Sequence, residues 1–135
     1  MSKTSSHGRY RLKRQKNGVG NFGQVAVEVI TSDGSHPPEV VWSVRPDDRY
    51  SVQPGVEQEF VDAAQDGICE GLRLAAAEGI DTGGLTVSIV EAELNMADIA
   101  ASAVRAAGVL AVLDALGIAD RFELGYADGW TVVRR

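Results

Sequence analysis

Residues 11–22 combine basic side chains, glycines and one aromatic ring, the residue types that contact RNA. Lysine and arginine neutralise phosphates, backbone amides at glycines approach phosphate oxygens closely, and an aromatic ring stacks on an unpaired base. This pattern predicts an RNA-binding segment; a purely structural turn with its ring packed inward is the alternative. The candidate contact residues are Arg11, Lys13, Arg14, Lys16, Gly18, Gly20, Asn21 and Phe22.

Charge is distributed unevenly along the chain. Residues 1–27 contain six Lys or Arg and no Asp or Glu, whereas residues 28–135 contain seven basic and 19 acidic residues. A basic patch on an acidic body favours an oriented contact with an anionic partner. The alternative is that these charges protect an edge strand, because lysine and arginine discourage aggregation through strand pairing.

No pattern in the sequence indicates catalysis or cofactor binding. The chain has no Gly-Lys-Ser or Gly-Lys-Thr for a nucleotide phosphate and no Gly-x-Ser-x-Gly. His7, His36 and Cys69 lack the spacing of metal ligands, and Cys69 is expected to pack as a small helical residue. We therefore expect a noncatalytic protein with no metal, no cofactor and no bound nucleotide.

Length and composition fit one globular domain. The chain has 135 residues, of which 44% are hydrophobic and 24% charged, enough for a core of its own. A single cysteine excludes an internal disulfide and favours a reducing compartment. The start has no apolar run of signal-peptide length, and no segment approaches a membrane span. These features predict a cytoplasmic protein with no membrane contact.

The basic segment is expected to lie in a β-hairpin. Residues 1–8 are polar and are expected to be disordered. Tyr10 and Leu12 alternate with charges, which predicts a half-exposed strand over residues 9–14. Asn17-Gly18 predicts a tight hairpin turn, because both central positions need positive φ. Two further strands are predicted over residues 24–31 and 40–44.

Two helices are predicted in the rest of the chain. Apolar residues at helical spacing indicate a helix from about residue 54 to Gly79 and another over 96–116, with a strand over 85–90 between them. Gly67 and Gly71 each cost a helix about 1 kcal/mol, so their spacing predicts close contact with a neighbouring backbone. The order β-β-β-α-β-α predicts an α+β two-layer sandwich, with two helices on one face of a mixed sheet.

Three strings, in this order, resemble domain IV of translation elongation factor G and its ribosomal protection relatives. They are Arg14 to Val25 (Arg-Gln-Lys-Asn-Gly-Val-Gly-Asn-Phe-Gly-Gln-Val), Pro54 to Glu70, especially its part from Phe60 to Ile68, and Ala107 to Ala111 (Ala-Gly-Val-Leu-Ala). The family has a glycine-rich turn at the first, an apolar pair, a short polar run and Gly-Ile at the second, and Ala-Gly-Ser-Met-Ala at the third. The resemblance covers residues 9–116 and implies a βαβ sandwich with a left-handed crossover. Residues 117–135 are then a C-terminal β extension packed on the same domain.

The sequence departs from that family at a loop. Where the family has Asp-Gly-Ser-Tyr-His-x-Val-Asp-Ser, this chain has Glu91-Ala92-Glu93-Leu94-Asn95-Met96-Ala97-Asp98, in which only Asp98 matches. In the family this loop approaches the decoding centre of the ribosome, and carboxylates there repel RNA phosphates.

The resemblance implies a noncatalytic binding module of translation-factor ancestry, here without the GTPase that usually carries it. The expected partner is the ribosome or another structured RNA, contacted through the basic hairpin. The alternative is a protein-interaction module, self-associating or bound to another protein, that kept the fold and lost RNA binding.

Overall fold

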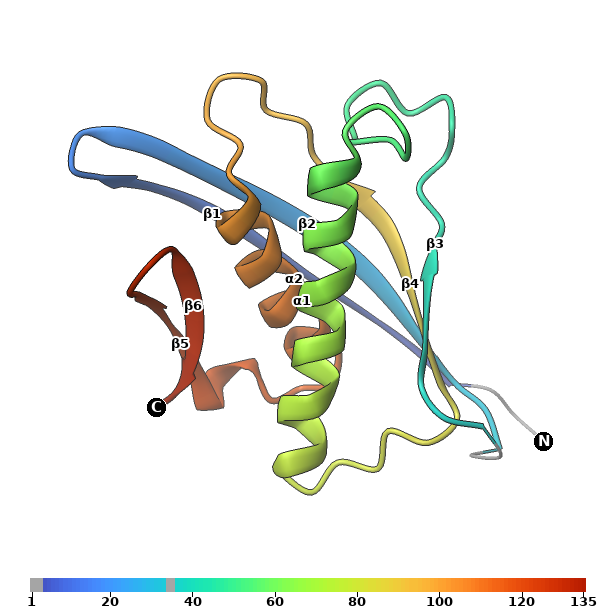
Figure 1. The fold of residues 1–135 in the computed structure, drawn as a ribbon. Helices are drawn as coiled ribbons and strands as arrows, with labels where there is room; N and C mark the ends of the chain where they lie inside the picture. Colours follow the sequence, from blue (N-terminus) through green and yellow to red (C-terminus); the bar gives the residue numbers. More distant parts are fainter. Residues whose placement is uncertain (1–3, 34–35) are drawn as a thin grey trace.

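The computed structural model describes residues 4–33 and 36–135 and shows an α+β fold of two layers. A mixed four-stranded sheet forms one layer, and two helices, α1 and α2, cover one of its faces (Figure 1). The strand order is β1-β2-β4-β3. In the described part of the chain, no helix combines the length and apolarity needed to cross a bilayer.

A long hairpin of β1 (Thr4–Lys16) and β2 (Val19–Thr31) begins the chain. The two strands pair over their whole length, from Thr4 opposite Thr31 to Lys16 opposite Val19. The turn residues Asn17 and Gly18 have φ angles of 53° and 78°, so the predicted turn with two positive φ angles is confirmed.

The expectation that residues 1–8 are disordered is wrong for residues 4–8; residues 1–3 lie outside the described part. Residues 4–8 pair with residues 27–31 of β2, and these backbone hydrogen bonds hold the stretch in the sheet although its side chains are polar. A strand of an antiparallel pair can have one face in solvent, where polar side chains are compatible with order. Gly8 is buried against Ala111 and Ala115, where a side chain would overlap the helix backbone.

The other half of the sheet contains β3 (Glu39–Trp42) and β4 (Leu85–Ala92). β4 runs antiparallel to β2 and parallel to β3, so the sheet is mixed as predicted. A register shift at Ala26 and Val27 interrupts the pairing of β2 with β4. Alternate residues of β2 and β4 point into the core beneath the helices: Val25, Val27, Val29, Leu85, Val87 and Ile89.

Helix α1 (Gln58–Ala77) packs on α2 (Ala101–Ala115). Both begin later than predicted, because residues 54–57 and 96–100 form turns and extended chain before the first helical turn. Gly67 is a point of close approach between the two helices: a Cβ there would overlap the carbonyl oxygen of Arg105. The close contact predicted from the glycines of the first helix is therefore confirmed.

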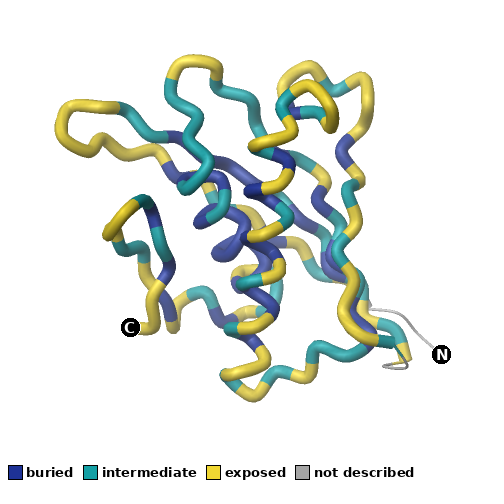
Figure 2. The backbone as a smooth tube through the Cα atoms, viewed as in Figure 1, coloured by how far each residue is buried: buried dark blue, intermediate teal, exposed yellow. Residues whose placement is uncertain are grey.

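Helix α2 lies between α1 and the β1–β2 hairpin and is the most buried of the described elements. Every residue from Ala103 to Leu113 except Arg105 is buried. Figure 2 shows this continuous buried centre, with exposure concentrated at loops and at the tip of the first hairpin. Gly23 lets β2 approach α2, since a Cβ there would overlap the backbone of Ala103.

A short 3₁₀ turn, η1 (Ala119–Arg121), leads to a second hairpin of β5 (Phe122–Tyr126) and β6 (Trp130–Arg134). Phe122, Trp130 and Val132 are buried in a cluster with Leu12 and residues of α2. On its outer side, Glu78 at the end of α1 accepts hydrogen bonds from Arg134 (2.8 Å) and Arg121 (3.2 Å). The hairpin is thus attached to both helices.

Replacing Gly67 with alanine tests the helix–helix contact. The added methyl group meets a backbone atom of α2, which cannot turn aside, so overpacking outweighs the gain of about 1 kcal/mol in helix propensity. We expect the free energy of unfolding in urea to fall by about 1–3 kcal/mol. Cys69→Ala, at an exposed position on the same helix, is the control and is expected to stay within about 0.5 kcal/mol. A Gly67→Ala protein as stable as the control would contradict the contact.

The pKa of Glu78 is lowered, first by the hydrogen bond from Arg134 and then by Arg121, against the opposing effect of burial. A carboxyl whose pKa is lower in the folded state stabilises the fold above its unfolded pKa, about 4.3 for glutamate. This contribution is lost as the pH falls through the lower, folded pKa. We therefore expect Glu78→Gln to flatten the acid limb of a stability-versus-pH curve, measured by thermal unfolding. An acid limb as steep as that of the unsubstituted protein would refute this assignment.

Candidate functional site

The tip of the first hairpin extends past the helix layer (Figure 1). Every residue from Lys13 to Val19 is exposed, whereas Leu12 on one side and Phe22 on the other are fully buried. We call residues 13–21 the hairpin tip. The tip contains most of the predicted RNA-contact residues, and it places their backbone and cations in solvent.

Two arginines below the tip are held by carboxylates on the open face of the sheet. Arg9 reaches Glu91 (Nη2 to Oε1, 3.1 Å), and Arg11 reaches Glu93 (Nη1 to Oε1, 3.2 Å). Glu91 also accepts a hydrogen bond of 2.7 Å from Gln24. These pairs neutralise part of the basic strand, so Arg11 is less available to a phosphate than its sequence position suggests.

Three predicted cations remain at the tip. Within residues 4–33 and 36–135, neither Lys13 nor Arg14 has a carboxylate within ion-pair distance. Lys16 lies over the ring of Tyr126, with its Nζ 4.7 Å from the ring centroid. An aromatic ring has no net charge, so this weak contact does not neutralise the ammonium group of Lys16 as a carboxylate would. The tip therefore has a local positive charge on an acidic protein.

The prediction that Phe22 stacks on a base is wrong. Its side chain is fully buried, and the guanidinium of Arg11 covers the ring at 5.0 Å from the centroid. Phe22 lies on the same face of the sheet as Lys13, its partner in β1, and its main chain bonds to residues 98–100, so the ring is removed from solvent. The inward-packed alternative of the sequence reading holds at this residue.

Gly20 and Asn21 lie at the junction between the tip and the loop before α2. The Phe22 amide donates to the carbonyl of Asp98 (2.8 Å), and the Ala100 amide donates to the carbonyl of Phe22 (3.1 Å). The Asp98 carboxylate lies directly over Gly20, where a Cβ would be 2.7 Å from Oδ1. Gly20 is therefore covered by an acid, and the exposed backbone for a phosphate lies nearer the turn, at Gly18.

The loop that departs from the family pattern forms its own turn. Asn95 accepts hydrogen bonds at its side-chain oxygen from the amides of Ala97 (3.2 Å) and Asp98 (3.1 Å). Met96 at its apex has 83% of its surface exposed, and Tyr50 in a neighbouring loop has 80%. The loops meet where the Leu94 amide donates to the carbonyl of Tyr50 (2.7 Å). These two adjoining loops thus present exposed apolar side chains.

Residues considered for other chemistry do not assemble into a site. Cys69 is exposed, which corrects the expectation that it packs inside. Among the residues that the structure describes, no group of three or more His, Cys, Asp or Glu is arranged to hold a metal ion. His7 lies 3.4 Å from Glu28, and His36 contacts Ser32, so the two histidines are in separate surroundings.

One functional contact was missed by the sequence reading. Tyr126 lies more than a hundred residues from Lys16 in the chain, and nothing in either local pattern indicates that they meet. Only the packing of the second hairpin against α2 brings this ring to the tip.

No known protein-family model matches this sequence, and a comparison with curated proteins found none that matches. The fold is similar to part of a solved crystal structure, that of the protein ttk003000868 from Thermus thermophilus, with a TM-score of 0.62 at 17% identity. The match covers 96% of this chain but 23% of that chain. At this identity the likeness shows the fold alone: an α+β unit with a mixed four-stranded sheet and two helices.

Phe22→Ala tests whether this ring belongs to the core. Loss of a fully buried phenyl ring leaves a cavity, and we expect the free energy of unfolding to fall by about 3–5 kcal/mol. Val19→Ala, at a position with 63% of its surface exposed, is the control and is expected to change stability by less than about 0.5 kcal/mol. A Phe22→Ala protein of unchanged stability would restore the ring as a free stacking group.

Proposed function

We propose that this protein is a noncatalytic, translation-factor-like binding module that contacts ribosomal or other structured RNA through the hairpin tip. The contact residues are Lys13, Arg14, Lys16 and the backbone around Gly18. Arg11 is left out because it forms an ion pair with Glu93, and Phe22 because its side chain is buried. The proposal assigns no catalytic step, cofactor or nucleotide to this chain.

The observation that carries this proposal is the charge of Lys13 and Arg14 on a projecting ribbon, with no carboxylate of residues 4–33 or 36–135 within ion-pair distance. Nearer the body, Arg9 and Arg11 of β1 are matched by glutamates. Leaving two adjacent cations unmatched at the exposed end of a ribbon suits phosphate binding, because each phosphate contact releases condensed counterions. The net charge of −6 keeps the remainder of the protein away from RNA, so binding is oriented by the tip.

The course of the chain adds support from the fold. In Figure 1 the chain rises along β3, descends along α1 in front of the sheet and rises again along β4, on the left of β3. We infer a left-handed crossover from this course, whereas most parallel crossovers are right-handed. The resemblance to elongation factor G domain IV implies such a crossover, and the shared glycine-rich turn falls at the tip.

A second candidate is a protein-interaction module, which the exposed Met96 and Tyr50 favour. Both side chains lie on loops that meet where the Leu94 amide donates to the carbonyl of Tyr50 (2.7 Å). Aromatic and methionine side chains are enriched in protein interfaces, so a protein surface beside the RNA would suit them.

Charge reversal at the tip tests the RNA proposal. We expect Lys13→Glu with Arg14→Glu to weaken binding to ribosomes and to a structured RNA hairpin, measured by co-sedimentation and fluorescence anisotropy across a salt series. Each lost phosphate contact lowers the slope of log K against log salt by roughly 1. The folded state should be unaffected, because both side chains are exposed.

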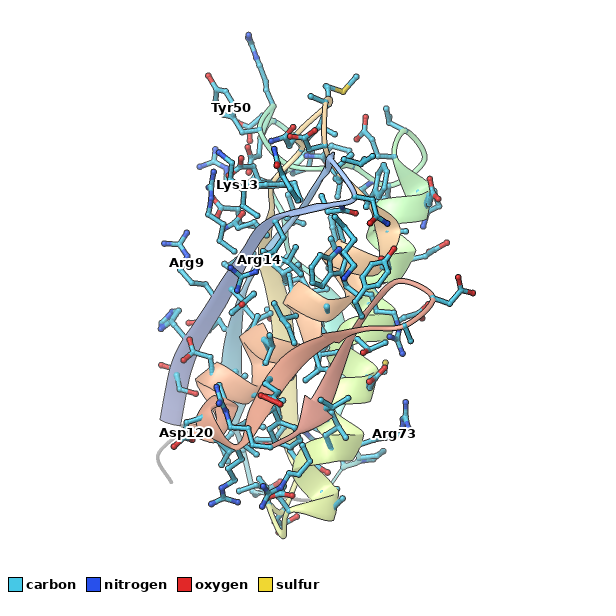
Figure 3. The ribbon with its side chains drawn as sticks, turned by 90° about the vertical axis from the view of Figure 1, so that its left-hand side faces the viewer. Arg9, Lys13, Arg14, Tyr50, Arg73 and Asp120 are labelled. Carbon is cyan, nitrogen blue, oxygen red and sulfur yellow. The ribbon has the colours of Figure 1, made fainter. Side chains whose placement is uncertain are left out.

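The matched control is Arg73→Glu with Arg49→Glu, which changes the net charge equally at residues outside the tip. Figure 3 shows Arg73 on α1, on the opposite side of the view from Lys13 and Arg14. The control is expected to retain binding with an unchanged salt slope. Equal binding by the tip variant and the control would sink the proposal, and binding to ribosomal proteins but not to RNA would favour the second candidate.

A further inference from the structure

The outer edge of β1 has backbone groups that pair with no other strand. The two-residue turn makes Lys16 and Val19 a hydrogen-bonded pair, and such pairs alternate along an antiparallel ladder. The N–H and C=O groups of the odd-numbered residues of β1 therefore point away from β2. The amide of Arg9 confirms this direction, since it donates to the Asp114 carboxylate of α2 (3.1 Å).

Other strand edges of the sheet are covered or short. The edge of β2 that faces away from β1 pairs with β4. Toward the tip, the same edge accepts a hydrogen bond at the Gln24 carbonyl from the Glu93 amide, and Phe22 bonds to residues 98–100. The outer strand β3 has four residues and follows Pro37 and Pro38, which limit further pairing. In the described part of the chain, the outward amides of Arg11, Lys13 and Gln15 have no acceptor.

A groove lies beside this open edge, and Arg9, Tyr10 and Arg14 of β1 line it. A cavity of about 540 Å³, within the usual range for ligand pockets, lies between β1, the end of α2 and β5. Its walls include the half-buried Tyr10 and Leu124, with Arg14 on the β1 side and Asp120 and Glu123 on the other. In Figure 3, Arg9 and Arg14 lie along the β1 side and Asp120 lies at the lower end.

Two contacts from β1 to other elements flank the open stretch of this edge. Arg9 meets Asp114 on one side, and Lys16 meets the ring of Tyr126 on the other. Between these contacts the edge from Arg11 to Gln15 is open. The groove thus offers backbone donors and acceptors on one side and apolar surface on its floor, the two requirements for binding a strand.

We propose that this groove binds an extended segment of another protein as an added strand on β1, with acidic residues alternating with apolar ones. Side chains of the added strand alternate between two faces. On the open face they lie beside Lys13, which has no carboxylate within ion-pair distance in the described part of the chain and which an acidic residue complements. On the other face they meet Tyr10 and Leu124, which apolar residues complement.

The charge of β1 decides between occupants. A second copy of the chain pairing β1 with β1 brings Lys13 and Arg14, which have no carboxylate within ion-pair distance in the described part of the chain, against the basic strand of its partner, and like charges directly opposite one another are destabilising. The same charges discourage non-specific aggregation through strand pairing at the open edge of β1. An acidic segment removes this penalty, so the occupant is a different chain rather than a second copy.

The probe is a fluorescent synthetic peptide, acetyl-Glu-Val-Glu-Leu-Glu-Val-Glu-amide, titrated into the full chain and followed by anisotropy and by amide hydrogen exchange. We expect saturable binding and slower exchange at Arg11, Lys13 and Gln15. N-methylation of alternate peptide residues separates strand addition from charge attraction. Methylation of the set that faces β1 weakens binding on the order of tenfold or more, because several hydrogen bonds are lost, and methylation of the other set does not.

Gln15→Pro provides a second test on the protein side. It removes one outward donor without changing the charge, and proline is tolerated at edge positions whose N–H faces solvent. It is expected to weaken peptide binding, whereas Gln15→Ala is not, and the methylated peptides settle the question even if the proline variant fails to fold. Equal binding of both methylated peptides, no binding at all, or a chain that dimerises through β1 in sedimentation equilibrium overturns the proposal.

Discussion

The burial of α2 is the constraint on which the rest of the structure depends. This helix contacts α1 on one side, the β1–β2 hairpin on another and the C-terminal hairpin on a third. Glycines at three contact points allow these approaches, since side chains at Gly8, Gly23 or Gly67 would overlap the backbone of α2. Close packing at that spacing leaves little tolerance for added volume. The long ribbon is therefore fixed at its base, and only its tip is free.

Charge follows from the same arrangement. Near the base of the ribbon, the sheet brings Glu91 and Glu93 within reach of Arg9 and Arg11, so the basic strand is neutralised where it crosses the body. Beyond the end of β4 no further acidic strand lies alongside in the described part of the chain, and Lys13 and Arg14 keep their charge. Exposed ion pairs contribute little to stability, typically about 0–1 kcal/mol. Their main effect here is to restrict the positive potential to the tip.

Much of the layer architecture could be predicted from the sequence. The sequence predicted a feature correctly where a residue type has a specific conformational role. Asn17-Gly18 favours a turn with positive φ angles, and the glycines inside the first helix allow a neighbouring backbone to come close. The start of the first strand could not be predicted, because Thr4 to Gly8 is polar and its order comes from pairing with residues 27–31. Helix starts were placed too early, since apolar spacing continues through residues that the structure uses as turns.

The candidate site was harder to predict than the fold. Glycines and cations mark the tip in sequence, but burial of Phe22 and pairing of Arg11 depend on residues 98–100 and on the end of β4, which are distant in the chain. Lys16 meets Tyr126 only because the second hairpin folds back on α2. The local sequence indicates which residues could contact RNA. Whether those side chains are free to do so depends on contacts with residues distant in the chain, which the local sequence does not indicate.

The two backbone hydrogen bonds of Phe22, to Asp98 and from Ala100, have a structural consequence. They join the ribbon, just below its free end, to the start of the most buried helix that the structure describes. The main chain of Phe22 therefore fixes the position of residues 98–100 directly before the first turn of α2, so the place where this helix begins is set by the ribbon as well as by the helix's own sequence.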